Sequence, residues 1–265
     1  MPRWMLPLAV AAALVIRAPG IDAQAPPDGL AAGAPGIARE VIDGDTLILA
    51  DGREVRLVGI QAPKLPLGRA GFRPWPLAAE AREALRRLAL GRRLTPRFGG
   101  ARADRHGRVL AHLVREDGLW LQGRLLADGM ARVYSFADNR AAVAEMLALE
   151  RAARAARRGI WGHPFYRVVP EGEAGRYIGS FQLVEGRIAA SAVVRGRGYL
   201  NFGADWREDF TIAVPPRSLG PFRDAFGRRL ERLAGQRVRV RGWIRSFNGP
   251  LVEATHPEQI EVLAP

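Results

Sequence analysis

The segment VIDGDTLILADGREVRLVGIQAPK, residues 41–64, alternates short apolar runs with turn residues. Gly44 separates the first two runs, and the pair Asp51-Gly52 is a strong signal for a β-hairpin. The strands that this pattern predicts cover residues 37–42, 46–50 and 53–60. The segment ends at Lys64, which is the only lysine among the forty basic residues of the chain.

The residues after Lys64 predict a helix, two further strands and two more helices. Residues 76–90 place leucine and alanine at helical spacing and are followed by Gly91, a helix stop. The later strands are expected at 94–98 and 108–114, and the later helices at 119–128 and 139–158. Three strands, a helix and two strands are the order of the OB-fold, a five-stranded Greek-key barrel.

A second unit with the same order begins near Gly172. Its expected strands are 179–189, 192–202, 209–214, 237–244 and 251–263, with a helix at 221–233. We therefore predict a mainly β fold with helices, of the α+β class, built from two five-stranded OB-fold-like barrels in tandem. The first barrel carries two additional C-terminal helices. The predicted domains cover residues 37–165 and 172–265.

The N-terminus has the pattern of an export signal. Arg3 precedes an apolar run of thirteen residues, Trp4 to Ile16, and small residues before Gln24 suit cleavage. That run is shorter than the roughly twenty residues that span a bilayer. We expect a signal peptide at residues 1–23, a flexible Pro/Gly/Ala-rich linker at 24–36, and a periplasmic or secreted protein without an integral membrane span after cleavage.

Composition points to a folded, basic protein. Hydrophobic residues make up 48% of the chain, and the net charge is +13, mostly from arginine. Such a charge attracts polyanions, so nucleic acid is an expected partner, although many individual arginines can simply be solvated. The chain has no cysteine, which excludes disulfides and thiolate metal sites.

Two carboxylates and two arginines form a candidate phosphodiester site. Asp43 and Asp45 flank a glycine turn, and carboxylate oxygens are the ligands that hard cations prefer. Arg56 and Arg108 carry planar guanidinium groups that can neutralise charge on a phosphoryl group in the transition state. An Asp-Gly-Asp sequence alone also fits an ordinary turn.

Residues from about 37 to 161 resemble the staphylococcal nuclease (thermonuclease) family. The matching motifs are Val41–Thr46, Val55–Ile60, Ala62–Pro63, Asp104–Arg108, Gly129–Val133 and Arg158–Trp161. The resemblance implies a nuclease that cleaves DNA and RNA with one Ca²⁺. It also implies that Asp45 binds the metal with Asp43 beside it, and that Arg56 and Arg108 are the catalytic, phosphate-binding arginines.

Two positions depart from the family pattern Asp-Thr-Pro-Glu. Gln61 stands where the resemblance implies a second metal-binding Asp, and Lys64 stands where it implies the general-base Glu. An ammonium beside two guanidinium groups cannot act as a base unless its pKa falls by several units. Both changes make the site more positive, which opposes cation binding. Lys64 either takes the cation position or is an exposed loop residue.

Further ligand contacts are expected around this site and in the second unit. Arg69 and Arg73 alternate with aromatic residues in the loop 66–76, a pattern that suits a nucleic-acid strand, and Asp104 and His106 adjoin Arg108. The second-unit candidates are Arg237, Arg239 and Arg241 on one strand face, with Tyr199 and Trp243 for stacking. The alternative for the three arginines is a solvated strand face.

These observations leave three hypotheses about function. The leading one is an exported nuclease-fold protein with a degenerate catalytic site that binds nucleic acid or another anionic ligand and needs no cofactor. The second is an active nuclease with an altered site, which would still use Ca²⁺. The third is a protein-interaction scaffold of the cell envelope, and the fold alone does not choose among them.

Overall fold

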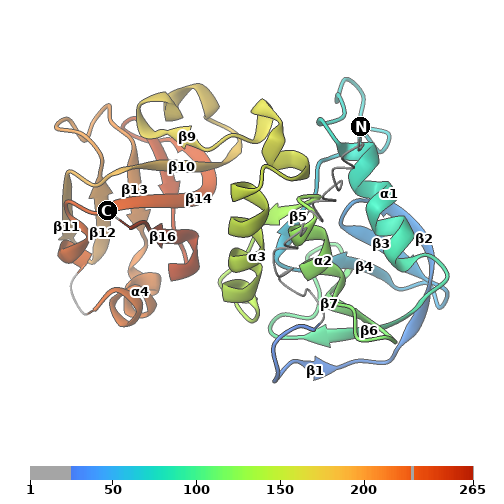
Figure 1. Cartoon of the computed structure of the whole chain (residues 1–265). Helices are drawn as coiled ribbons and strands as arrows, with labels where there is room; N and C mark the ends of the chain where they lie inside the picture. The colour runs from blue at the N-terminus through green and yellow to red at the C-terminus, as the bar shows by residue number, and fades with distance from the viewer. Residues whose placement is uncertain (1–24, 228–229, 265) are drawn as a thin grey trace, which may run out of the picture.

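The computed structural model describes residues 25–227 and 230–264 (Figure 1). The expected signal peptide lies outside these residues. The described chain is mainly β with helices, as the sequence predicts, and its strands form two separate barrels. None of the described helices is long and apolar enough to cross a membrane.

The first barrel is a closed ring of five strands. Its strands are β2 (Gly36–Asp43), β3 (Thr46–Leu49), β4 (Glu54–Leu57), β6 (Arg93–Phe98) and β7 (Val109–Arg115). The ring runs β2-β3-β4-β7-β6 and closes from β6 back onto β2. Only the β4–β7 pair is parallel within this ring. This connectivity and closure are those of an OB-fold barrel.

Three helices and a short strand pair complete the first unit. They are α1 (Ala78–Ala89), α2 (Leu121–Ala127), α3 (Val143–Ala155), β5 (Ile60–Gln61) and β8 (Arg132–Val133). Helix α1 turns its small residues Ala81 and Ala84 and the larger Leu85 into the barrel core. The antiparallel pair β5–β8 ties the chain after the barrel to the loop that carries Lys64.

The second barrel repeats the same strand order. Its strands are β10 (Phe181–Arg187), β11 (Ala190–Val194), β12 (Arg197–Asn201), β13 (Thr211–Val214), β14 (Arg237–Ser246) and β15 (Pro250–Glu253). Strands β10 and β11 are successive parts of one bent path and pair with β14 and β12, respectively, while β13 and β15 pair in parallel. Helix α4 (Leu219–Phe226) lies between β13 and β14 in the sequence, as α1 lies between β4 and β6.

Short elements fill the connections. The additional strands are β1 (Ala31–Ala32), β9 (Val169–Pro170) and β16 (Ile260–Val262). The 3₁₀ turns are Gly159–Gly162, Pro164–Tyr166, Glu171–Tyr177, Pro216–Ser218, Leu230–Leu233 and Pro257–Gln259.

Three expectations need correction. The predicted strand 192–202 is a hairpin, because Arg195 and Gly196 take positive φ angles of 49° and 76° and reverse the chain. The predicted strand 251–263 is two strands, β15 and β16, that pair with different parts of β14. The predicted flexible linker 24–36 is partly ordered, because β1 pairs with β6 and the Gly33 amide donates to the Pro96 carbonyl at 2.8 Å.

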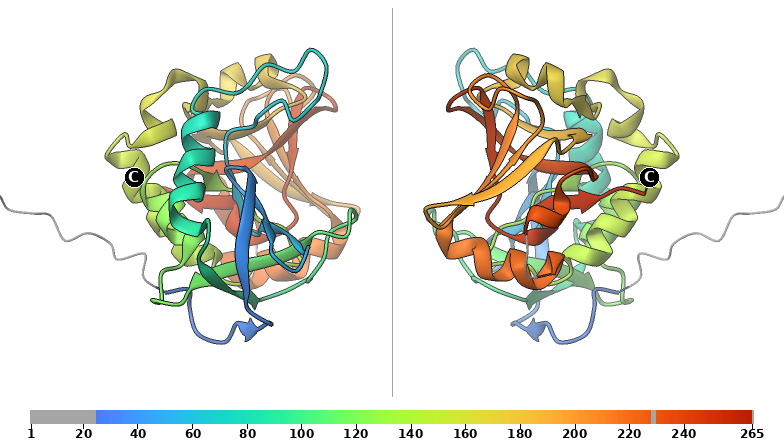
Figure 2. Two further views of the ribbon diagram at one scale, coloured as in Figure 1. Left: turned by 90° about the vertical axis from the view of Figure 1, so that its right-hand side faces the viewer. Right: turned by 90° about the vertical axis from the view of Figure 1, so that its left-hand side faces the viewer.

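Helix α3 lies between the two barrels (Figure 1), and a buried carboxylate on it links the first unit to the second barrel. In the end-on views one barrel lies in front of the other (Figure 2). Glu150 is fully buried, and it accepts hydrogen bonds from the Val133 amide at 2.6 Å and from both terminal nitrogens of Arg241 at 3.0 Å. Arg241 on β14 is also buried and pairs with Glu261 at 2.6 Å. A charge pair this deep stabilises a structure only when its hydrogen bonds are satisfied, as they are here.

Other polar contacts surround this pair. They are Arg140–Glu258 at 2.7 Å, Arg151–Glu261 at 3.2 Å, Ser135 Oγ to His256 Nε2 at 2.7 Å, and the Trp243 indole donating to the Tyr134 hydroxyl at 2.9 Å. Each joins the region of α3 or β8 to the second barrel, so the barrels are connected by a polar interface rather than by a linker alone.

We expect Arg241→Met to lower the free energy of unfolding by about 3–5 kcal/mol, because it leaves the Glu150 carboxylate buried without its charged partner. Arg237→Met is the matched control on the same strand face. Arg237 is 57% exposed at the side chain and pairs with Glu185, so its loss should cost about 0–1 kcal/mol. Urea denaturation measures the loss of unfolding free energy in both variants. Equal losses in the two variants would contradict the assignment of the interface to Arg241.

Candidate functional site

The two predicted metal carboxylates lie at the turn between β2 and β3. Asp43 ends β2, and its carboxylate accepts a hydrogen bond from the Asp45 amide at 3.0 Å. Gly44 between them permits the turn to pack closely, since a Cβ there would lie 2.6 Å from Ala62 and 2.9 Å from Ala81. Asp45 is completely buried, so its negative charge needs partners inside the protein.

Lys64 supplies the first partner. Its ammonium lies 2.8 Å and 2.7 Å from the two carboxylate oxygens of Asp45 and 3.5 Å from Asp43. The side chain of Lys64 is only 21% exposed. Lys64 is therefore a cation held between two carboxylates rather than a free loop lysine.

Arg56 on β4 supplies the second partner. Its guanidinium lies 3.2 Å from the Asp45 carboxylate. It also donates to the carbonyl oxygens of Asp45, Leu57 and Ile60 at 3.2, 2.8 and 2.7 Å. These contacts hold Arg56 against the protein backbone. We call Asp43, Asp45, Arg56 and Lys64 the cation cluster.

The electrostatics of the cation cluster differ at its two carboxyl groups. Burial by itself raises the pKa of Asp45, but the charges of Arg56 and Lys64 outweigh it and bring that pKa to about 2. The pKa of Asp43 is raised instead, first by burial and then by the neighbouring charge of Asp45. Asp45 is thus a stable anion that two cations already neutralise.

Gln61, at the other altered family position, points away from the cation cluster. Its carbonyl oxygen accepts from Nε and Nη2 of Arg132 on β8, at 2.9 and 2.6 Å. Arg132 is itself buried, and its guanidinium lies 4.7 Å from the ring centre of Phe181 in the second barrel and 5.7 Å from that of Trp75. Burial lowers the pKa of Arg132 to about 10.

The residues present do not fit a bound Ca²⁺ ion. Calcium takes six to eight oxygen ligands, usually with several carboxylates. Here an ammonium occupies the face that Asp43 and Asp45 share, and the Gln61 oxygen is engaged by Arg132. Within residues 25–227 and 230–264, no group of three or more His, Asp or Glu side chains is arranged to hold a metal.

Arg108, the second predicted phosphate-binding arginine, lies beside a cleft of about 590 Å³. The cleft is lined by Arg56, Leu57, Val58, Gly59, Ile60, Ala103, Asp104, Arg105, His106, Arg108, Leu110, Tyr134, Phe136, Asp138 and Asn139. Asp104 organises its rim by accepting from the amides of His106 and Arg108 at 2.8 and 3.1 Å. The same carboxylate pairs with the Arg108 side chain at 2.7 Å. The Arg108 side chain remains 30% exposed, within reach of a ligand in the cleft.

The aromatic loop lies apart from this cleft. Arg69 donates to the carbonyl oxygens of Pro66 and Leu65 and stacks on Phe72 at 3.8 Å, so it is engaged within its own loop. Arg73 is exposed on the same loop. Neither arginine lines the cleft of Arg108.

The second-barrel candidates divide into three groups. Arg237 and Arg239 lie side by side on β14 and pair with Glu185. Arg241, expected on a ligand-binding face, is buried at the interface, because that strand face continues into the contact with Glu150. It is not available to track a phosphate backbone, which corrects the prediction. Tyr199 lines a separate cavity, whereas Trp243 donates to Tyr134 at the interface.

Sequence reasoning missed three residues of the site. Arg132 falls within the Gly129–Val133 motif, but its contact with Gln61 joins residues 71 positions apart. Tyr134 and Phe136 line the cleft and pack edge to face with ring centres 4.9 Å apart. They come directly after that motif, so the motif was a signal for their position but not for their role.

The first unit matches a known family from β4 onward. Residues 54–163 match the family described as "Staphylococcal nuclease homologue". No curated protein matches the chain. The matched residues include Arg56, Gln61, Lys64, Arg108 and Arg132, and this part of the chain is similar to that family.

We expect Gln61→Glu to raise the free energy of unfolding by about 1–3 kcal/mol at pH 7, because a carboxylate there forms a charge-assisted pair with Arg132. The folded-state pKa of the new Glu would fall below its ordinary value of about 4.3, so the gain should disappear as the pH falls through that range. Urea denaturation of the variant and the parent at pH 7 and pH 3.5 measures this difference in the free energy of unfolding. A Gln61→Glu variant less stable than the parent at pH 7 would contradict this account of Arg132.

Removing the ammonium should leave the two carboxylates of the cation cluster open to a calcium ion. In Lys64→Ala, Asp43 and Asp45 lose their shared partner, and we expect a loss of about 1–3 kcal/mol in the free energy of unfolding. Millimolar Ca²⁺ should then raise the melting temperature of this variant but not of the parent or of Lys64→Arg, which keeps a cation. Equal Ca²⁺ effects on all three proteins in thermal denaturation would contradict this role of Lys64.

Proposed function

We propose that this chain, whose residues 54–163 are similar to staphylococcal nuclease homologues, is an exported protein that binds single-stranded nucleic acid without cleaving it. One observation is the main support for the proposed loss of cleavage. The Lys64 ammonium bonds to both carboxylate oxygens of Asp45 at 2.7–2.8 Å, in the position where the family resemblance implies a calcium ion. The same lysine replaces the carboxylate that would activate water.

The chemistry of hydrolysis lacks two parts at this site. A water molecule attacks phosphorus only after a base or a metal ion has made it nucleophilic. Lys64 is paired with carboxylates, and those carboxylates are occupied by Lys64 and Arg56. Arg108 can still contact a phosphate group, but binding alone does not lower the barrier to its cleavage.

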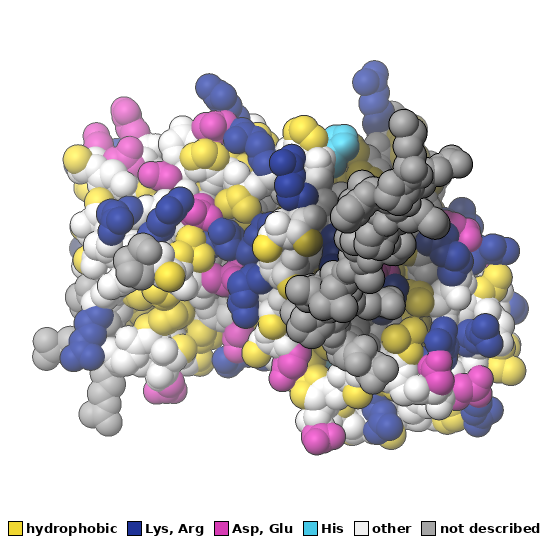
Figure 3. Space-filling view, in the orientation of Figure 1, with side chains coloured by type: hydrophobic (Ala, Val, Ile, Leu, Met, Phe, Trp, Pro, Cys, Tyr) yellow, Lys and Arg dark blue, Asp and Glu magenta, His cyan; other side chains and the backbone are white. Residues whose placement is uncertain are grey.

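The cleft beside Arg108 supports the binding part of the proposal. Its lining contains three arginines, two aspartates and the rings of Tyr134 and Phe136. Phe136 is 50% exposed. Guanidinium groups follow a phosphate backbone while bases stack on exposed rings, which is the usual arrangement for single strands. The basic side chains are spread widely over the visible face of the molecule and are interspersed with acidic ones, so they form no single large patch there (Figure 3).

Export is supported by the sequence of residues 1–23, and the mature chain is proposed to begin near Gln24 in the periplasm or outside the cell. Mass spectrometry of the protein recovered from the producing cells identifies the first residue of the mature chain. A recovered chain that keeps Met1 and remains in the cytoplasm would contradict export.

The test of function has two measurements. Cleavage of a fluorogenic single-stranded oligonucleotide is followed with Ca²⁺ or with EDTA, and binding of the same strand is measured by fluorescence anisotropy. We expect no turnover in either buffer and binding that weakens as salt rises. Removing one phosphate contact reduces the slope of log K against log salt by about 0.7. Arg105→Ala and Arg108→Ala should each weaken binding about fivefold. Arg124→Ala, an exposed arginine on α2, is the matched control.

The possible results separate the three hypotheses. Turnover that requires Ca²⁺ and disappears in Arg108→Ala would establish an active nuclease with an altered site. The absence of both turnover and binding at low salt would favour the envelope scaffold. Equal weakening by Arg124→Ala would show nonspecific attraction to a basic protein rather than a site in the cleft.

A further inference from the structure

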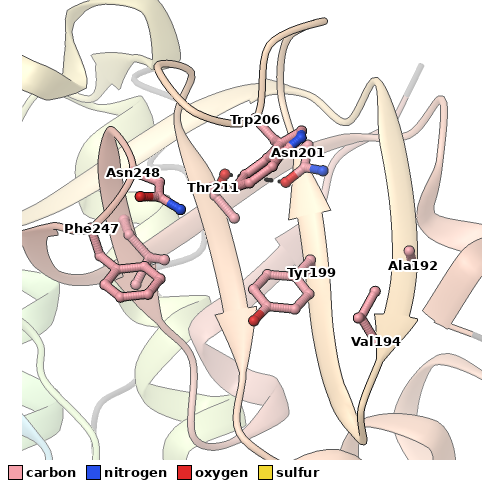
Figure 4. A pocket seen from close by; sticks show the side chains of 9 residues that line it. Ala192, Val194, Tyr199, Asn201, Trp206, Thr211, Phe247 and Asn248 are labelled. Carbon is pink, nitrogen blue, oxygen red and sulfur yellow. Dashed lines mark hydrogen bonds between the residues drawn. The ribbon is translucent and has the colours of Figure 1, made fainter.

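The second barrel has an open cavity on the face formed by β11, β12 and β13 (Figure 4). Its volume is about 330 Å³, close to the smaller end of ligand sites. The lining residues are Ala192, Val194, Tyr199, Asn201, Trp206, Thr211, Phe247, Asn248 and Leu251. In the OB-fold this strand face and the hairpin between the last two strands are where oligonucleotides or oligosaccharides commonly bind.

Three aromatic rings from separate parts of the chain border this cavity. Tyr199 projects from β12, Trp206 from the loop between β12 and β13, and Phe247 from the hairpin between β14 and β15 (Figure 4). Trp206 and Phe247 are 47% and 61% exposed. Large exposed aromatic residues gathered around a cavity mark a binding surface more often than single exposed side chains do.

The loops that carry Trp206 and Phe247 are held in place. The Asp209 carboxylate accepts from the Asp205 amide at 2.8 Å, which closes the loop around Trp206. Gly249, with a φ of +85°, packs against this loop so closely that a Cβ there would lie 2.6 Å from the Glu208 carbonyl oxygen. The two rings are therefore positioned relative to each other before a ligand arrives, which reduces the entropy lost on binding.

The polar groups in the cavity are neutral. They are the amides of Asn201 and Asn248 and the hydroxyls of Thr211 and Tyr199, and the Thr211 hydroxyl donates to the Asn201 oxygen at 3.2 Å. Amides and hydroxyls both donate and accept hydrogen bonds, so they match the hydroxyl groups of a sugar. Among the described residues, no Arg, Lys, Asp or Glu lines this cavity.

Two arginines beside the cavity have carboxylate partners. Arg207 lies 3.8 Å from Asp205 and stacks on Trp206, and Arg197 pairs with Glu253 at 3.1 Å. The cavity is thus unlike the surface expected for a polyanion, in a chain whose net charge is +13. The contrast with the arginine-lined cleft of the first barrel points to a different class of ligand.

We infer that this cavity binds a neutral oligosaccharide. The rings of Tyr199, Trp206 and Phe247 present flat, negatively polarised faces on which the C–H face of a sugar ring can pack. The amides and hydroxyls between them then bond to the hydroxyl groups at the edge of the sugar. The site uses none of the residues of the nucleic-acid cleft and does not depend on the function proposed for it.

The test is calorimetric titration of the full chain with cellohexaose, with a β-1,4-linked hexamer of N-acetylglucosamine, and with a ten-residue oligothymidylate. We expect one of the two saccharides to bind and the affinity to be insensitive to salt. Trp206→Ala and Phe247→Ala should each weaken this binding at least about tenfold, because they remove a stacking ring. Phe165→Ala, which removes a 47%-exposed aromatic ring outside the cavity, is the matched control and should leave the binding unchanged.

Two results would overturn the inference. The first is the absence of binding by both saccharides at concentrations up to about 10 mM, where even weak affinities are detected. The second is salt-sensitive oligothymidylate binding that is lost in Trp206→Ala, which would make the cavity a nucleic-acid site. Loss of oligothymidylate binding in Arg108→Ala alone concerns only the first-barrel cleft, so the two proposals fail separately.

Discussion

The buried carboxylate of Glu150 joins the first unit of this molecule to the second barrel through direct hydrogen bonds. It bonds to the Val133 amide on β8 and to Arg241 on β14, so one side chain of α3 contacts both the first unit and the second barrel. The residue before Val133 is Arg132, whose guanidinium holds Gln61 and lies against Phe181 of the second barrel. The position of the second barrel is therefore linked through short contacts to the loop that carries Lys64.

The cation cluster shows how a chain can satisfy a buried negative charge without a metal. Asp45 has no exposure to solvent, and a charge in that position needs either an ion or a cationic side chain. Lys64 and Arg56 provide two cationic side chains, and their charges keep the pKa of Asp45 near 2. A calcium ion would have to displace an ammonium that is already in hydrogen-bonding contact, and it would meet Arg56 nearby. The exchange is electrostatically unfavourable.

The two barrels share one strand order and differ in surface chemistry. In the first, arginines border the cleft and their partners are carboxylates and backbone carbonyls. In the second, the open face carries aromatic rings and neutral amides. The strand order determines where a concave face lies, but the side chains on that face determine which ligand it can bind. This difference is the basis for proposing a separate ligand class for each barrel.

The sequence by itself determined the class and order of the elements, because the alternation of apolar residues, the glycine stops and the Asp51-Gly52 turn are local signals. The family resemblance marked Lys64 and Gln61 as departures from the pattern Asp-Thr-Pro-Glu. The hairpin at Arg195-Gly196 escaped detection because a positive φ at a non-glycine residue has no clear sequence signal. Only the tertiary structure decided which partner each charge takes. Lys64 meets Asp45 across 19 residues, Gln61 meets Arg132 across 71, and Arg241 meets Glu150 across 91. Such pairs depend on how strands and helices pack in space. An alternating pattern of polar and apolar residues in a strand is the same whether its polar face contacts water or a second barrel.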